Sequence, residues 1–211
     1  MRQDTGSDMR PTQGQPHAGV SAMTAGTPPA TLRHARAAQL FEAMPEIAED
    51  MEAMPDPAIG TLEFLDQLAA SPTPEEAITF AAQALQHRHA VWWAHECLRH
   101  LAELLDETDR DMLANAAAWV SEPSEANRIA AQTAAMAAPA KTPGVWVALG
   151  AAWSGGSMGP PDLPPVPPAP HLTGRALNAA VLSALARVDQ AHRAQALAGF
   201  VRMARILATQ E

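Results

Sequence analysis

Residues 73–101 read TPEEAITFAAQALQHRHAVWWAHECLRHL, and the spacing of their apolar residues decides the predicted fold. Thr73 can cap a helix, Pro74 suits a first helical turn, and Glu76 stands at the capping-box position. The apolar residues that follow recur every three or four positions, as in amphipathic helices. They are Ala77, Ile78, Ala81, Ala84 and Leu85, then Ala90, Ala94, Cys97, Leu98, Leu101 and Leu105. This stretch therefore predicts two successive helices.

Apolar residues recur every three or four positions on both sides of this stretch as well, from Thr31 onward. Ala is abundant, whereas Val, Ile and Thr are sparse, which favours helices over a sheet. Ala126, Ile129, Ala130, Thr133, Ala134 and Ala137 predict a narrow, Ala-lined helix. The segment VWVALGAAW (145–153) is apolar almost all round, so it predicts a helix but leaves a buried strand open. Thr173 is the predicted cap of a later helix.

We predict an all-α fold, either an irregular helical bundle or a short α-solenoid of helix hairpins. Trp93, Trp119 and Trp146 recur 26 and 27 residues apart, which favours hairpin repeats. Chance placement of three tryptophans explains this spacing nearly as well.

The length of 211 residues fits one domain with a tail. Residues 1–30 are rich in Gly, Pro, Ser, Thr and Gln, which predicts a disordered tail. Residues 31–211 are the predicted helical domain. Within it, residues 154–172 hold seven prolines between positions 160 and 170, and such a run favours an extended polyproline II path. We call residues 154–172 the strap.

The formal net charge of −9 argues against binding to nucleic acid or to an anionic membrane surface, because both require clustered Lys and Arg. Six acidic residues and no basic residue lie in FEAMPEIAEDMEAMPDP (41–57), which predicts a solvated connection or a docking site for a basic partner. The N-terminus has no apolar signal-peptide core, and no apolar run is long enough to span a membrane. We expect a cytoplasmic protein without a membrane span.

Several histidines surround the single cysteine, Cys97, in HRHAVWWAHECLRH (87–100) and suggest a metal site. His95 and His100 are five residues apart, about 140° around a helix, whereas a zincin needs four residues and about 40°. Cys97 falls on the apolar stripe and fits a core thiol. One cysteine also forms no intramolecular disulfide. We therefore predict no metal and no cofactor.

Gly155-Gly156-Ser157-Met158-Gly159 matches the G-x-S-x-G motif of serine hydrolases, and Asp162 and His171 follow in hydrolase order. That motif needs a strand before the serine and a helix after it. Prolines follow Ser157, so the supporting helix cannot form. We predict a Gly-rich helix stop and no catalytic residues, with a serine hydrolase using Ser157 as a remote alternative.

The strap itself has two interpretations. Its prolines can brace the Ala-rich helices by stacking on tryptophans, or they can form a ligand segment for an aromatic groove on another protein. We favour the brace. The predicted interaction surface consists of Trp92, Trp146, Trp153, Ser157, Pro161, Pro164, Pro165, Pro167, Pro168 and His171.

The succession AVWWAHECLR, AAAWVSEPSEANRIAAQTAA and TPGVWVALGAAWSGGSMGPPDLPPVPPAPHLTGRALNAAV resembles an uncharacterised bacterial family encoded near type VI secretion genes. The resemblance covers residues 35–208 and implies a role in that contractile secretion system. The stretch from WWAHECLRH to PSEANRIAAQTAA is also similar to helical putative immunity proteins, which neutralise toxins.

We therefore expect a non-enzymatic adaptor or accessory protein that binds a secretion-system component or effector. The alternative is a toxin-neutralising immunity protein.

Overall fold

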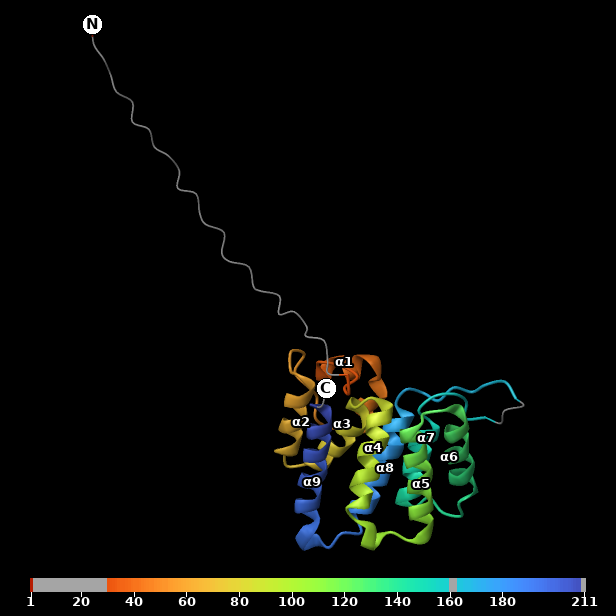
Figure 1. Ribbon diagram of the computed structural model, residues 1–211. Helices are drawn as coiled ribbons and strands as arrows, with labels where there is room; N and C mark the ends of the chain where they lie inside the picture. Colours follow the sequence, from red (N-terminus) through yellow and green to blue (C-terminus); the bar gives the residue numbers. More distant parts are fainter. Residues whose placement is uncertain (2–29, 160–162, 210–211) are drawn as a thin grey trace.

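The computed structural model describes residues 1, 30–159 and 163–209, and among these residues it contains helices and no β-strand (Figure 1). The predicted all-α fold is confirmed. Two isolated antiparallel bridges, Leu32 with Leu85 and Arg36 with Gly60, fasten the start of the described chain to the helices. Nearly all of the predicted tail lies outside the described residues.

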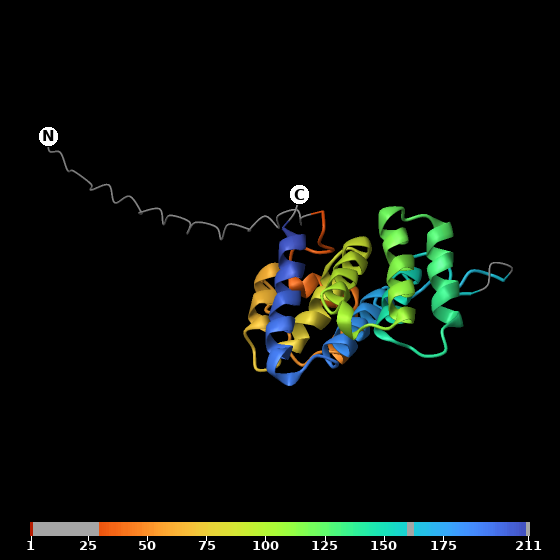
Figure 2. The ribbon, with the colours of Figure 1, turned by 60° about the horizontal axis from the view of Figure 1, so that its bottom comes forward.

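The described elements form a single array. They are α1 (Ala37–Ala43), the 3-10 helix η1 (Pro45–Glu49), α2 (Thr61–Ala69), α3 (Glu75–Ala84), α4 (His87–Arg99), the 3-10 helix η2 (Ala102–Leu104), α5 (Glu107–Ser121), α6 (Glu125–Ala137), α7 (Pro143–Ala152), α8 (Leu172–Leu185) and α9 (Gln190–Ala208). Figures 1 and 2 show α2 and α9 at one side of this array and α6 at the opposite side. None of the described helices is both long and apolar enough to cross a bilayer.

Helix α7 lies at the centre, between α5, α6 and α8. Its sequence is apolar on every face, and each of its residues except Trp146 is buried. A helix of this kind has to be surrounded by other elements. A Cβ atom on Gly150 would lie 2.4 Å from a Leu177 methyl group, so glycine allows α7 and α8 to approach closely. The segment that the sequence leaves open as a strand is therefore a helix.

Two predicted helix caps are wrong. Thr73 does not cap α3, which begins at Glu75 after Pro74. The carboxylate of Glu76 instead accepts hydrogen bonds from the backbone amides of Glu52 (2.8 Å) and Ala53 (3.2 Å). Thr173 lies buried inside the first turn of α8, one residue after the helix begins. In the first case, a contact between distant segments replaces the local capping interaction.

The acidic segment 41–57 packs against the helices as well as connecting them. Phe41 and Ile47 are buried in the core. The guanidinium of Arg175 on α8 pairs with the carboxylates of Glu49 (3.2 Å) and Asp50 (2.7 Å). This segment is therefore fixed to the core by apolar burial and to α8 by charge.

Candidate functional site

The strap contains a loop whose two sides are joined by hydrogen bonds. The Met158 amide donates to the Val166 carbonyl at 2.8 Å. The Val166 amide donates to the hydroxyl oxygen of Ser157 at 3.0 Å, and the Gly159 amide donates to the same oxygen at 3.1 Å. We call residues 157–166 the strap loop. These bonds close the loop at its neck and hold its base in a defined shape.

The strap loop presents apolar side chains to solvent. Leu163 is 57% exposed and Val166 is 51% exposed. Pro164, Pro165 and Pro167 are also exposed. Figures 1 and 2 show this part of the strap projecting beyond α6. The brace interpretation does not fit residues 163–167, because a brace would bury its prolines against the helices. Pro161 lies outside the described residues.

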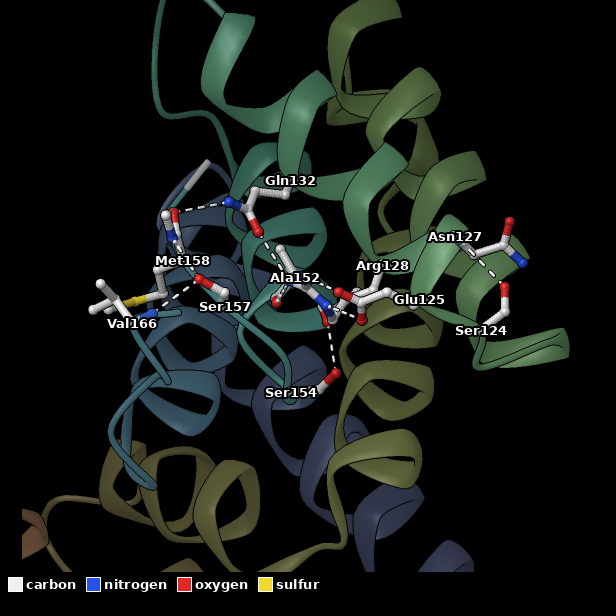
Figure 3. Close-up of polar contacts among 12 residues, drawn as sticks. Ser124, Glu125, Asn127, Arg128, Gln132, Ala152, Ser154, Ser157, Met158 and Val166 are labelled. Carbon is white, nitrogen blue, oxygen red and sulfur yellow. Dashed lines mark hydrogen bonds and ion pairs between the residues drawn. The ribbon is translucent and has the colours of Figure 1, made fainter. Parts of the chain in front are cut away.

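A buried arginine on α6 holds the segment that leads into the strap loop (Figure 3). Arg128 is 4% exposed. Its Nε and Nη2 atoms each lie 2.7 Å from a carboxylate oxygen of Glu125. Its Nη1 atom donates to the Ala152 carbonyl at 2.7 Å and to the Gln132 side-chain oxygen at 2.8 Å. Arg128 thus ties α6 to the end of α7.

Gln132 extends this network to the strap loop. Its side-chain nitrogen donates to the Met158 carbonyl at 2.9 Å, next to the neck of the loop. The largest influence on Glu125 is its hydrogen bond from Arg128, which lowers the pKa of the carboxyl and keeps it ionised near neutrality. A chain of charge-assisted and neutral hydrogen bonds therefore runs from Glu125 to the loop, and it fixes where the loop leaves the domain.

Gly156 makes room for Arg128. Its φ angle is +64°, in the left-handed region that favours glycine. A Cβ atom at this position would also lie 2.5 Å from the Nε atom of Arg128. Both the turn of the chain and the closeness of the guanidinium thus require glycine here.

A groove of about 430 Å³ lies between α6 and the strap loop. Ile129 and Met136 on its α6 side are 40% and 65% exposed. The groove is lined by Glu125, Arg128, Ile129, Gln132, Thr133, Met136, Ser157, Met158 and Gly159. The apolar members of this lining, Ile129, Met136 and Met158, form with the exposed apolar residues of the strap loop a surface of the kind that marks interaction sites. We call this surface the loop–α6 face.

The apolar residues whose spacing predicts α6 lie mostly on the solvent-facing side of that helix. Ile129, Ala130 and Thr133 are exposed, whereas the buried residues of this helix are Arg128, Ala131 and Ala135. Because the guanidinium of Arg128 has hydrogen-bond partners inside the protein, the side of α6 that carries Arg128 faces inward, and the side that carries Ile129 faces solvent. Sequence reasoning missed Arg128, Ile129, Gln132 and Met136. The sequence offers one signal for this network: Glu125, Arg128 and Gln132 share one helix face, because the latter two follow Glu125 by three and seven residues.

The other predicted surface residues do not join the loop–α6 face. Trp146 and Trp153 are half-buried and pack against the core. Pro168 is half-buried, and His171 is buried beside α8, with its Nδ1 atom 3.6 Å from a Glu46 oxygen. Trp92 stands on α4, in a groove shared with α9, which lies across the molecule from α6 (Figure 1).

The hydroxyl of Ser157 serves as a hydrogen-bond acceptor for two backbone amides, not as a partner of an imidazole. The segment before it is helix α7, whereas a nucleophile elbow needs a strand. Asp162 lies outside the described residues.

The histidine cluster forms structural contacts. His95 stacks on Trp92 with ring centroids 5.1 Å apart, and its Nδ1 atom lies 3.0 Å from a Glu96 oxygen. Cys97 is fully buried, and burial raises the pKa of its thiol well above the usual range. Among the described residues, no group of three His, Cys, Asp or Glu side chains is placed to hold a metal ion.

A family model described as a family of unknown function, DUF6931, matches residues 64–208 of this chain. The match includes α3 to α9 and the whole strap. Neither the curated proteins nor the solved structures contain a match.

Proposed function

This chain belongs to the DUF6931 family of unknown function, and we propose that it is a non-enzymatic interaction protein that binds a protein partner through the loop–α6 face. The observation that carries the proposal is the gathering of exposed apolar side chains on two adjacent elements. Ile129 and Met136 lie on the α6 side of the groove, and Ser157, Met158 and Gly159 of the strap loop line it as well. Leu163 and Val166 are exposed on the same loop.

Preorganisation supports the proposal. A segment whose base is already fixed before binding loses less conformational entropy in the complex than a fully flexible one. Ser157 closes the neck of the strap loop, and Arg128 and Gln132 fix its base. Prolines restrict the loop further, since their φ angles are fixed. Several hydrogen bonds, of which the one from Arg128 to Ala152 is buried, thus fix the base of a segment whose described apolar side chains are largely exposed.

The chemistry of the loop–α6 face favours a protein as partner. Its exposed large side chains are Ile, Met, Leu and Val, and one arginine there, Arg128, is already paired. A phosphate backbone would require several free cations. The resemblance to a family encoded near type VI secretion genes suggests that the partner is a component or effector of that system. The protein would then serve as an adaptor or accessory protein.

The proposal is tested by affinity purification of the full chain from cells that contain the secretion genes. We expect L163S/V166S and I129S/M136S each to lose the partner that the wild type retains. I206S is the matched control, because Ile206 is 52% exposed but lies on α9. Retention of the partner by both double variants, with unchanged circular dichroism, would refute the assignment. If the partner is a toxin whose growth arrest co-expression relieves, the protein acts as an immunity protein.

A further inference from the structure

One pair of side chains holds both ends of the strap. The Nδ1 atom of His87, at the start of α4, lies 2.9 Å from the Ser154 carbonyl oxygen, where the strap begins. The Nη1 atom of Arg33 donates to the Pro170 carbonyl at 3.4 Å, where the strap ends. The same Nη1 atom lies 3.4 Å from the Nε2 atom of His87. Three segments that are distant in sequence therefore meet at the base of the strap.

These contacts require a neutral imidazole. A carbonyl oxygen can only accept, so Nδ1 of His87 carries the hydrogen that it donates to Ser154. The guanidinium of Arg33 can only donate, so Nε2 of His87 has to be the acceptor. Protonation of Nε2 would place two donors and two positive charges against each other. The contact with Ser154 would survive protonation, whereas the contact with Arg33 would not.

The surroundings give an imidazolium ion at this position no compensating charge. Arg33 is the charged group that acts on His87 from the N-terminal segment. Helix α7 and the described part of the strap up to Pro170 contain no titratable side chain. On α4 itself, the titratable residues that follow His87 are Arg88, which donates to the Val120 carbonyl, and His89. The next titratable residue along the strap is His171, whose Nδ1 atom lies 3.6 Å from a Glu46 oxygen.

We propose that Arg33 and His87 form a pH-sensitive latch: the contact of Arg33 with the Pro170 carbonyl persists while His87 is neutral and is lost when His87 is protonated, whereas Gln83 continues to hold the adjacent His171 carbonyl. Released from His87, the Arg33 guanidinium moves away and its bond to Pro170 breaks. The start of the strap stays bound through Ser154. The latch itself does not depend on the proposed function. Only its consequence does: opening the latch changes how the strap presents the loop–α6 face to a partner.

The direction of the titration is consistent with this latch. Burial is the largest influence, and it lowers the pKa of His87; the Ser154 carbonyl opposes this effect, and Arg33 adds to it. The neutral form is therefore favoured in the folded protein. The stabilisation is present above the ordinary histidine pKa of about 6.5 and is lost as the pH falls through the lowered value.

The test is an NMR titration of the labelled full chain from pH 8 to pH 5, without any partner. The imidazole signals report each histidine, and the ¹³C shift of the Pro170 carbonyl reports its bond to Arg33. We expect the Pro170 signal to change with the midpoint of His87, not with that of His171. H87N keeps a donor to Ser154 but does not titrate, so this change should disappear. R33Q should raise the His87 midpoint toward about 6.5.

H89N is the matched control and should behave like the wild type. A Pro170 transition that persists in H87N, or that follows the midpoint of His171, would overturn the latch. An unchanged His87 midpoint in R33Q would overturn it as well. Because no partner is present, these results are separate from those of the affinity purification that tests the proposed function.

Discussion

The hydroxyl oxygen of Ser157 accepts a hydrogen bond from the Val166 amide, 3.0 Å away and nine residues further along the chain. The serine that the sequence marks as a candidate nucleophile is thereby the residue that closes the strap loop. Its second amide partner, from Gly159, occupies the same oxygen. The glycines and the serine of this motif shape a turn.

Substitution S157A should loosen the strap loop with little effect on the helices. Two neutral hydrogen bonds are lost, so we expect the free energy of unfolding to fall by about 1–2 kcal/mol. Urea denaturation measures this loss, and partner capture measures the effect on binding, which should weaken. S183A is the control, because the Ser183 hydroxyl only donates to the Ala180 carbonyl within α8. Ester hydrolysis by the wild type that S157A abolishes would contradict this role.

Substitution R128M should destabilise the protein more than E125A. Arg128 is buried, and its removal leaves the Ala152 carbonyl and Gln132 without their partner, at a cost of about 2–3 kcal/mol. The Glu125 side chain is 60% exposed, so water can replace part of its interactions, but E125A also leaves the buried guanidinium without its carboxylate partner and should cost about 1–2 kcal/mol. Thermal and urea unfolding of the two variants check this order. Equal losses would show that the ion pair, not the contacts of Arg128 with α7 and Gln132, holds the strap.

Substitution G156A should destabilise the protein, whereas G155A should be tolerated. Alanine at position 156 would adopt a left-handed conformation and meet Arg128, at a cost of at least about 1–3 kcal/mol. A Cβ atom on Gly155 would have no neighbour within 4 Å. The difference in urea midpoints between these adjacent variants is the measurement. Similar midpoints would mean that the turn rearranges freely.

Substitution D109N should destabilise the protein near neutral pH and matter less in acid. The buried Asp109 carboxylate accepts from the Gly144 amide (2.8 Å) and from Arg187 (2.9 Å). Burial acts to raise the pKa of Asp109, but these hydrogen bonds and the Arg187 charge outweigh it, so the pKa is lowered. The stabilisation is therefore present above the unfolded pKa of about 3.9 and lost as the pH falls through the folded value.

Unfolding of D109N and wild type at pH 7 and at pH 3 measures this effect. We expect a difference of about 2–3 kcal/mol at pH 7 and a smaller one at pH 3. D111N is the control, because Asp111 is exposed on the same helix. A difference that does not change with pH would contradict the role of the Asp109 charge.

Helices α6 and α7 differ in how much of their packing their sequences predict. Helix α7 is apolar all round, so any packing arrangement buries it. Helix α6 carries both apolar residues and Arg128, and its pattern predicts a helix without revealing which side faces inward. The orientation depends on the Ala152 carbonyl, 24 residues away, which accepts from Arg128. No local propensity encodes such a partner.

The sequence by itself determined the helical class and the end of α7 before the Gly-Gly stop. These features follow from periodicity and from the backbone limits of proline and glycine, which act over a few residues. The tertiary structure alone decided that Ser157 closes a loop, that Arg128 is buried, and that Ile129 faces solvent. Each of these depends on hydrogen-bond partners that only packing brings within 3 Å, so they cannot be deduced from neighbours along the chain.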